Sequence, residues 1–409
     1  MKYAITGGTI VTPEEILKDS AVVIENDRIK KVGVIDKDID FVVNLKKDFL
    51  IFPGLINAHD HMLGTYYPRV GSGPYISWLP WDDDLKSHPL YKERNKIESV
   101  DLYLLCAYRN MISGVTTVSD HIPHTVNKDF IDKMPVRVIK DYSLEHECSS
   151  ADLRWGRGIT LEHSEAVKSG IPFITHIEEG FDEESTLGID ILNELNVLDE
   201  YTVLIHGIAF SKEDIKLISE KKANVVWCPA SNYFMFKTTT DIKELLQKRV
   251  NVSLGTDSSM SGSLNLLEEM KFASSLYKKL YGERLDDKTL VNMVTINPAK
   301  AFRLKGLGRI EEGYLADLLI INEGNPDRPY ESLVKATIDN VEMVLSNGIP
   351  IYGYENHRDY FNCFRKDYQK LNINERERII IGKPVELYRR IWDNVGFKKI
   401  LPFFPVNIN

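Results

Sequence analysis

Short apolar runs alternate with longer helix-like stretches between residues 49 and 307, and this alternation restricts the fold more than any other feature. The runs have the length and branched side chains of buried strands, and they read LIFPGLINA, GVTTVSD, PVRVIKDY, IPFITHI, YTVLIHG, KANVVWC and VNVSLGT. Stretches between them, such as SLNLLEEMKFASSLYKKLYG, carry apolar residues three and four positions apart, which predicts amphipathic helices. Apolar strands that each lead into a helix indicate a parallel sheet covered by helices.

The number of strand–helix units favours a closed barrel. Seven strands are clear, and an eighth is expected between Ser143 and Gly158, where the strand signal is poor. Seven or eight units in about 260 residues fit an α/β fold of the (β/α)8 TIM-like barrel type better than an open, doubly wound sheet. No GxGxxG follows the first strand, which argues against a dinucleotide-binding fold.

The two ends of the chain have a different residue pattern from the central part. Residues 1–48 contain brief runs with branched residues, broken by turn-forming residues, and the same β texture returns from residue 308 onward. We therefore predict that residues 1–48 and 308–353 form one small β-sandwich beside a barrel domain of residues 49–307. Residues 354–409 are predicted to be a partly helical extension that packs against the barrel or a neighbouring subunit.

Composition excludes several classes of partner. The net charge of −9 and the absence of a dense basic stretch disfavour nucleic acids and anionic membranes. Four widely spaced cysteines indicate neither a disulfide framework nor a thiolate metal site. Because the chain has no signal-peptide core and no apolar span of about 18 residues, we expect a cytoplasmic protein. Its expected partners are a small-molecule substrate and, in a homodimer, a second copy of the chain.

Polar residues gather at the C-terminal ends of the apolar runs, which is the end where barrel enzymes keep their active sites. The first run ends in His59 and His61, which point to the same side of a strand because side chains alternate with period two. The corresponding residues of later runs are His121, His176, His206 and Asp257, with Glu178 and Glu179 following His176.

Three histidines and one carboxylate at one barrel mouth make a four-ligand set for Zn²⁺ or a similar divalent ion, with room for water. Each residue alone has an ordinary alternative. His176 fits a hydrogen-bonded core histidine, Asp257 a helix N-cap, and His206 a partner of a backbone carbonyl. It is improbable that all of these strand-end residues have ordinary structural roles at the same time. The sequence therefore favours a metal site.

The motifs PGLINAHDH, HIEEG, VLIHG, WCPASN and LGTDS resemble, in that order, those of the amidohydrolase superfamily. More narrowly they are similar to its cytosine-deaminase, guanine-deaminase and chlorohydrolase-like branch, and the resemblance covers residues 1 to about 350. The resemblance implies a site for one divalent metal ion, Zn²⁺ first, with Fe²⁺ or Mn²⁺ as alternatives. The ligands that it implies are His59, His61, His176 and Asp257.

The resemblance also implies a hydrolytic deaminase of an aminated N-heterocycle, such as a nucleobase, nucleoside or pterin. Glu179 is the candidate that carries a proton from water to the substrate nitrogen. Asp257 is expected to accept the remaining water proton through its second oxygen, and His206 to steady the attacking oxygen. The alternatives are hydrolysis of another C–N bond, as in a cyclic amide, or of a C–Cl bond, and a non-catalytic scaffold, which missing ligands would indicate.

The segment TYYPRVGSGPYISWLPWDDDL after the first run is the predicted substrate loop. Its aromatic residues, Tyr66 and Trp81 among them, suit stacking on a planar heterocycle, and Arg69 suits an anionic or acceptor group. The alternative is a packed lid without ligand contact. His121 and Asn232 are further candidates for substrate binding, and His146 and Trp155 are weaker ones.

Overall fold

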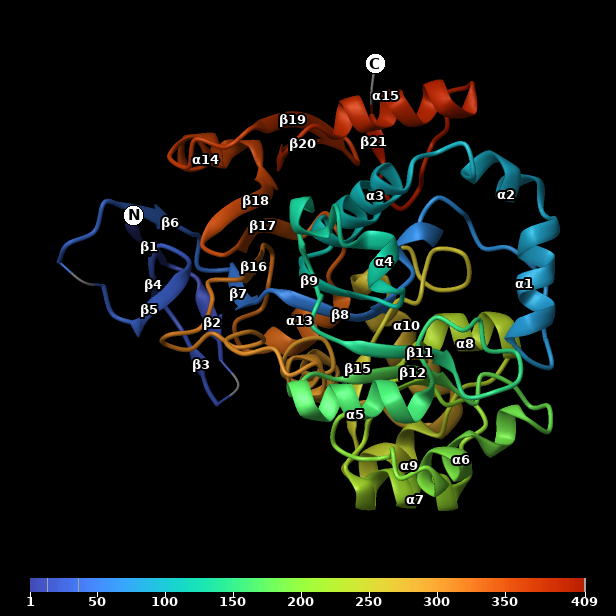
Figure 1. Cartoon of the computed structure of the whole chain (residues 1–409). Coiled ribbons are helices and arrows are strands. Elements are labelled where there is room, and N and C mark those ends of the chain that lie inside the picture. The colour runs from blue at the N-terminus through green and yellow to red at the C-terminus, as the bar shows by residue number, and fades with distance from the viewer. Residues whose placement is uncertain (13, 36, 408–409) are drawn as a thin grey trace.

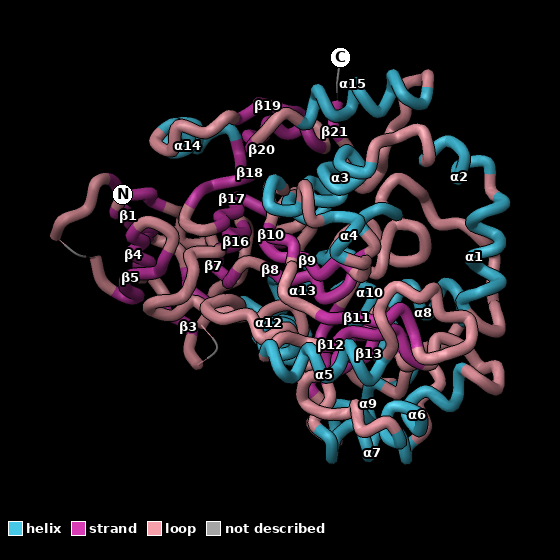
Figure 2. Tube along the Cα trace, in the orientation of Figure 1, coloured by secondary structure: helices cyan, strands magenta, loops and turns pink. Residues whose placement is uncertain are grey.

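The computed structural model describes residues 1–12, 14–35 and 37–407 (Figure 1). Residues 13 and 36 of the predicted sandwich, and residues 408 and 409 of the predicted extension, lie outside the described residues. Figure 2 shows helices gathered around the strands of the central part of the chain, whereas strands predominate where the two chain ends lie.

Within the described residues, eight strands run parallel in two sheets, ordered β10-β9-β8 and β11-β12-β13-β14-β15. A parallel bridge between Asp60 and Asp257 joins the end of β8 to the segment after β15. The strands are β8 (Leu55–Asp60), β9 (Val115–Asp120), β10 (Arg137–Val138), β11 (Ser143–Glu147), β12 (Phe173–Ile177), β13 (Thr202–His206), β14 (Asn224–Trp227) and β15 (Asn251–Leu254).

The poor strand signal after Ser143 corresponds to β11, which pairs with β12 in parallel. The signal is poor because Glu145, His146 and Glu147 are polar, although all three are buried. Burial on both faces normally selects apolar residues in a parallel strand. Three buried polar residues in a row therefore point to a strand end that does more than fill the core.

Helices follow the strands and cover them. Their bounds are α3 (Ser99–Met111), α5 (Ile159–Ser169), α6 (Gly188–Glu194), α7 (Lys212–Lys221), α8 (Pro229–Phe236), α9 (Ile242–Gln247), α10 (Leu266–Tyr281), α11 (Asp287–Asn292) and α12 (Ile296–Ala301). Helix α10 begins where the Asn265 side chain accepts a hydrogen bond from the backbone of Glu268, and it ends at Gly282, whose left-handed backbone suits glycine.

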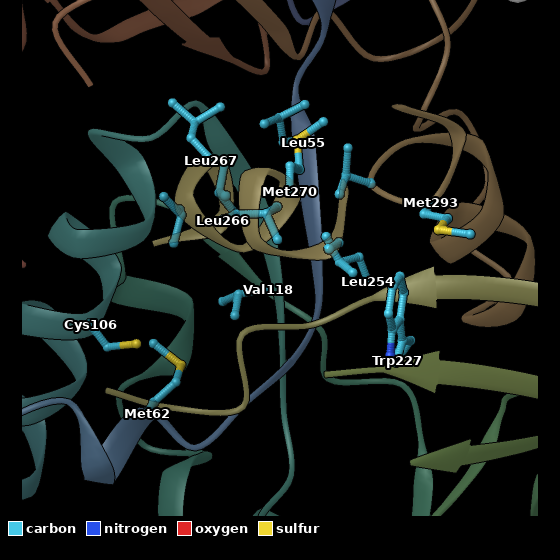
Figure 3. Close-up of a cluster of buried hydrophobic side chains, with 14 of the residues drawn as sticks. Leu55, Met62, Cys106, Val118, Trp227, Leu254, Leu266, Leu267, Met270 and Met293 are labelled. Carbon is cyan, nitrogen blue, oxygen red and sulfur yellow. The ribbon is translucent and has the colours of Figure 1, made fainter. Parts of the chain in front are cut away.

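The largest apolar cluster lies between these helices and the strands. Figure 3 shows part of it, where Leu55 of β8 and Leu254 of β15 lie near Met270 of α10. Burial of apolar surface contributes about 25 cal/mol per Å², so this cluster is the main source of stability for the strand ends that carry the histidines.

The remaining strands form two further sheets, ordered β5-β4-β1-β6 and β21-β19-β20-β18-β17-β16-β7-β2-β3. The first contains β1 (Lys2–Thr6), β4 (Ala21–Glu25), β5 (Arg28–Gly33) and β6 (Phe41–Asn44). The second contains β2 (Thr9–Val11), β3 (Ile16–Leu17), β7 (Leu50–Pro53), β16 (Leu318–Ile321), β17 (Val341–Ser346), β18 (Ile349–Tyr354), β19 (Tyr368–Ile373), β20 (Arg376–Ile381) and β21 (Val406–Asn407).

The run LIFPGLINA is two strands rather than the single strand that the apolar pattern predicts. Strand β7 pairs with β2 and β16, whereas β8 pairs with β9. The chain passes from one sheet to the other at Gly54, where a Cβ atom would lie 2.4 Å from Oγ1 of Thr116. Glycine is therefore required at this crossing point, and an apolar pattern alone does not reveal the change of sheet.

The C-terminal extension contributes strands as well as helices α14 (Arg358–Asn362) and α15 (Pro384–Val395). Strand β20 pairs with β18 and β19, which extends the second sheet. Helix α15 lies beside α3, where Nη2 of Arg390 is 2.6 Å from Oδ1 of Asp101. In the part of the chain that the structure describes, no helix is long and apolar enough to cross a membrane.

Candidate metal centre and active site

The end of β8 carries His59 and His61 on one side and Asp60 on the other. The imidazole ring centroids of His59 and His61 are 4.8 Å apart. Oδ2 of Asp60 accepts hydrogen bonds from Nδ2 of Asn110, at 3.0 Å, and from the guanidinium of Arg109, both on α3. This buried hydrogen-bond network fixes the position of the strand end. The sequence did not predict this role for Asp60, Arg109 or Asn110.

His176 of β12 and Asp257, three residues beyond β15, approach the two histidines closely. Nε2 of His59 lies 3.4 Å from Nε2 of His176 and 3.4 Å from Oδ1 of Asp257, and Nε2 of His61 lies 3.3 Å from the same oxygen. Four ligand atoms about 2.1 Å from a tetrahedral Zn²⁺ lie about 3.4 Å from one another. The three separations that link His59 to His176 and to Asp257, and His61 to Asp257, match this spacing.

The protonation of the histidines also suits a metal ion, which binds neutral imidazole. Burial lowers the pKa of His59 to about 3, and it lowers the pKa of His176 well below its ordinary value. Nδ1 of His176 lies 2.9 Å from the backbone oxygen of His146. A carbonyl oxygen only accepts, so Nδ1 carries the proton and the lone pair on Nε2 is free for an ion.

Asp257 is oriented by two hydroxyl groups. Burial would raise the pKa of its carboxyl, but the hydrogen bond with His59 and the charges of the nearby histidines hold it well below the usual range. Its Oδ2 accepts hydrogen bonds from the hydroxyls of Ser231 and Ser261, each at 2.6 Å. This corrects the expectation that the second oxygen is open to receive a water proton, because two donors already occupy it.

Glu179 and His206 face each other beside this cluster. Glu179 lies two residues beyond β12, and its Oε1 is 3.5 Å from Nε2 of His206, the last residue of β13. Burial, together with the charge of Asp257, raises the pKa of Glu179 well above its ordinary value. Nδ1 of His206 lies 2.9 Å from Oδ1 of Asn232, which fixes the ring. Glu179 thus lies beside His206 in surroundings that favour its protonated form.

A cavity of about 300 Å³ opens onto these groups, at the lower end of the range for small-molecule sites. Its lining includes His61, His176, Glu179, His206 and Asp257. It also includes the aromatic residues Tyr67, Trp78, Trp81, Tyr91 and Trp155. A larger hollow, of about 680 Å³, lies beside β11 and α5, and its lining contains none of the clustered histidines.

Two predicted residues of the substrate loop lie in different places. Trp81 lines the cavity, and its Nε1 donates to the backbone oxygen of Val70 at 2.9 Å. Arg69 instead lines a separate hollow, where its Nε donates to the backbone oxygen of Gly262 at 2.9 Å and its guanidinium lies over the ring of Phe234. The structure thus corrects the assignment of Arg69 to substrate binding.

Three further candidates are buried away from the cavity lining. Tyr66 donates its hydroxyl to Glu93, Asn232 lies behind His206, and the ring of His121 packs against that of His176 with centroids 4.1 Å apart. These positions correct their assignment to substrate contact. They support the neighbours that line the site.

Several polar residues that the sequence did not single out also line the cavity, namely Asp82, Lys86, Arg94 and Asp120. His146, only a weak candidate from the sequence, lines the cavity as well. Helices α1 (Trp78–Ser87) and α2 (Pro89–Arg94) bring the first three of these polar residues to the rim. The sequence did contain a signal for these residues. A helix-forming stretch follows WLPWDDDL and extends the predicted substrate loop to residue 94.

Comparisons with known proteins identify a matching family and similar proteins. Residues 161–350 match the model of the Amidohydrolase family. The chain is 28% identical over 379 residues to the 5-methylthioadenosine/S-adenosylhomocysteine deaminase of Pyrococcus furiosus, an alignment that covers 79% of this chain and 87% of that protein.

Solved structures share the fold across almost the whole chain. An atrazine chlorohydrolase from Arthrobacter aurescens TC1, complexed with zinc, superposes with a TM-score of 0.77 at 16% identity and covers 96% of this chain and 100% of its own. An adenosine deaminase from Xanthomonas campestris with bound zinc gives 0.74 at 18% identity, with coverages of 96% and 98%. At these identities the likeness supports the fold alone.

Proposed function

Because this chain belongs to the amidohydrolase superfamily, we propose that it is a metal-dependent hydrolase that deaminates an aminated N-heterocycle. The observation that carries the proposal is the placement of Glu179. Its carboxyl lies 3.5 Å from His206, borders the cavity, and belongs with His176 and His206 to a group whose ligand atoms all lie within 4.8 Å of one another. Hydrolytic deamination needs a group that carries protons between the attacking water and the substrate, and Glu179 borders the cavity that would hold the substrate.

His59, His61, His176 and Asp257 would hold one divalent ion, and we propose that the ion is Zn²⁺. Three imidazole nitrogens and one carboxylate oxygen, with three of their separations close to tetrahedral spacing, suit Zn²⁺, and two solved structures of the same fold contain zinc. When bound, such an ion acts as a Lewis acid and lowers the pKa of water toward about 7.

The protein's own groups would then move the protons. Protonated Glu179 would donate to the ring nitrogen of the substrate, and the resulting carboxylate would accept one proton from the attacking water and pass it to the amino group, which departs as ammonia. The second proton of that water would return to Glu179 as the carbonyl group of the product forms, which restores the acid. His206, held by Asn232, orients that water. Because Ser231 and Ser261 occupy Oδ2 of Asp257, we assign the proton transfers to Glu179 and a ligand role to Asp257.

The substrate class that we propose is an adenosine-type nucleoside. Support comes from the relative in Pyrococcus furiosus, whose name specifies a thioether adenosine. The cavity offers aromatic walls for a planar base, and Asp82, Lys86 and Arg94 at its rim for polar substituents of the sugar.

The proposed function requires a fold that brings the strand ends with the histidines together at one mouth. We propose that β8 to β15 close into a (β/α)8 barrel of residues 49–307, and that residues 1–48 and 308–353 form the companion β-sandwich. Support comes from the strand order, from the bridge between Asp60 and Asp257, and from the TM-score of 0.77 to the chlorohydrolase. In such a barrel the histidines share the C-terminal mouth.

Release of ammonia tests the proposal. Zinc-loaded protein is incubated with adenosine, 5′-methylthioadenosine, guanine, cytosine, a pterin and atrazine, and both ammonia and chloride are measured. We expect ammonia from an adenosine-type nucleoside, and none from His176→Ala protein prepared in the same way. Chloride without ammonia would favour the C–Cl alternative, and no product from any compound would contradict the proposal.

A further inference from the structure

Three buried ring nitrogens next to the metal centre lack a hydrogen-bond partner among the described residues. One is Nδ1 of His146, which lines the cavity, and the other two are Nδ1 of His59 and Nδ1 of His121. The side chains of His59 and His121 are almost fully buried, and their ring centroids are 5.6 Å apart with the planes nearly perpendicular. Because a buried polar atom without a partner costs about 1–3 kcal/mol, the coincidence of two such atoms requires an explanation.

The two nitrogens are complementary. Nε2 of His59 faces His176 and Asp257, so its lone pair belongs to the metal ion and the proton of the ring lies on Nδ1. Nε2 of His121 lies 3.2 Å from the backbone oxygen of Glu145, which only accepts. A neutral His121 ring therefore carries its proton on Nε2 and a lone pair on Nδ1. Nδ1 of His59 is therefore a donor without an acceptor, and Nδ1 of His121 is an acceptor without a donor.

The backbone and the cavity place His121 on the metal side rather than the substrate side. The backbone nitrogen of His121 donates to the backbone oxygen of Asp60, which fixes it beside the end of β8. The cavity lining contains His146, the other cluster histidine with an unpartnered Nδ1, but it does not contain His121. His121 also falls with His59 and His176 into one group whose ligand atoms lie within 4.8 Å of one another.

We propose that His121 is a positioning residue of the metal centre: its Nδ1 accepts a hydrogen bond from Nδ1 of His59 through one bridging water. A metal-binding histidine normally donates its second nitrogen to such an acceptor, which fixes the ring and raises its basicity. Among the proposed ligands, His176 has this partner in the backbone of His146. His121 supplies it for His59. The inference rests on the ligand set proposed above.

Two substitutions separate the acceptor at Nδ1 from the donor at Nε2. In His121→Asn the amide oxygen occupies the place of Nδ1, so the acceptor for His59 is kept and the bond to Glu145 is lost. In His121→Gln the amide nitrogen occupies the place of Nε2, so the bond to Glu145 is kept and the acceptor is lost. The matched control is His124→Gln, since His124 also binds a backbone oxygen, that of Tyr142, at 2.9 Å.

The experiment measures the affinity of each protein for Zn²⁺ by competition with a chelator, together with the visible spectrum of the Co²⁺ form. We expect His121→Gln to bind zinc about 10- to 100-fold more weakly, and His121→Asn and His124→Gln to bind as the wild type does. The Co²⁺ spectrum should keep the band intensity of the wild type throughout.

Equal affinity in all four proteins would overturn the inference, and so would equal losses in both His121 variants, which would indicate packing alone. A changed Co²⁺ band intensity in both His121 variants would instead make His121 a metal ligand and would also overturn it. If the wild-type protein itself binds no transition metal, the ligand set fails, and this outcome is distinct from failure of the His121 role.

Discussion

Ser231 donates its hydroxyl to Oδ2 of Asp257 at 2.6 Å, and Ser261 donates to the same oxygen at the same distance. Hydrogen bonds to a carboxylate are stronger than those between neutral groups, so the pair fixes the direction in which the carboxylate points. The other oxygen, Oδ1, is thereby left facing His59 and His61. The two serines act on the metal centre through Asp257.

Replacing either serine should weaken metal binding. We expect Ser231→Ala to raise the dissociation constant for Zn²⁺ about 10- to 100-fold, because groups that orient a ligand typically contribute this much. The measurement is competition with a chelator. Ser113→Ala is the control, since Ser113 is equally buried but donates to the backbone oxygen of Asn110. An affinity of Ser231→Ala equal to that of the control would contradict the prediction.

The four proposed metal ligands could be found from the sequence because each stands at or just beyond the end of an apolar run. The ends of parallel strands meet at one edge, so His59, His61, His176 and Asp257 had to converge once the runs were recognised as parallel strands. Which oxygen of Asp257 stays open could not be found in this way. That depends on Ser231, which lies on a different element.

The substrate loop could not be resolved from the sequence for a different reason. Strand periodicity fixes where a side chain points, but loop residues have no such period. Arg69 and Trp81 lie in one loop, yet only Trp81 reaches the cavity. Arg94 reaches it from a short helix that closes the same connection.

Glu179→Gln should separate proton transfer from metal binding. The substitution keeps the size of the side chain and removes the carboxyl that carries the proton. We expect kcat to fall by about 10²–10⁴-fold, the usual contribution of general acid–base catalysis, while the zinc content per chain is unchanged. Steady-state kinetics and elemental analysis measure the two quantities.

Glu178→Gln is the matched control for that experiment. Oε1 of Glu178 accepts a hydrogen bond from the backbone of Ile189 at 3.1 Å, away from the cavity. Burial raises the pKa of Glu178 to about 8, so glutamine resembles the protonated acid that is present at pH 7. Turnover should therefore stay near the wild-type rate. Loss of turnover in Glu178→Gln, with normal turnover in Glu179→Gln, would reverse the assignment.

Arg94→Ala and Arg69→Ala should have opposite effects. Arg94 lines the cavity, so its loss should raise KM about 10- to 100-fold for a substrate with an anionic or acceptor group, equivalent to about 1.5–3 kcal/mol. Arg69 is exposed, but it donates to the backbone oxygen of Gly262 and lies over Phe234, so its loss should lower the free energy of unfolding by about 0.5–1.5 kcal/mol. Kinetics and urea unfolding measure these effects, and the reverse pattern would contradict both assignments.

Glu269 of α10 should make the stability of the protein depend on pH. Its side chain is buried, and it accepts hydrogen bonds from the backbone of Ala230 at 2.8 Å and of Ser263 at 3.2 Å. Burial outweighs these bonds and raises its pKa to about 7, from an ordinary value of 4.5. Between these two pH values the unfolded chain has released the proton and the folded chain still holds it, so unfolding becomes easier as the pH rises.

The free energy of unfolding should accordingly fall between about pH 4.5 and 7, by at most about 3 kcal/mol, and the contribution of Glu269 should be constant above pH 7. Urea unfolding at pH 5, 6, 7 and 8 measures this slope. Glu269→Gln has no proton to release, so its curve should be flatter than that of the wild type between pH 5 and 7, whatever constant offset the lost carboxyl causes. Glu268→Gln, a partly exposed neighbour on the same helix, should keep the wild-type slope. Equal slopes in the wild type and Glu269→Gln would show that the buried carboxyl does not hold its proton in the folded state.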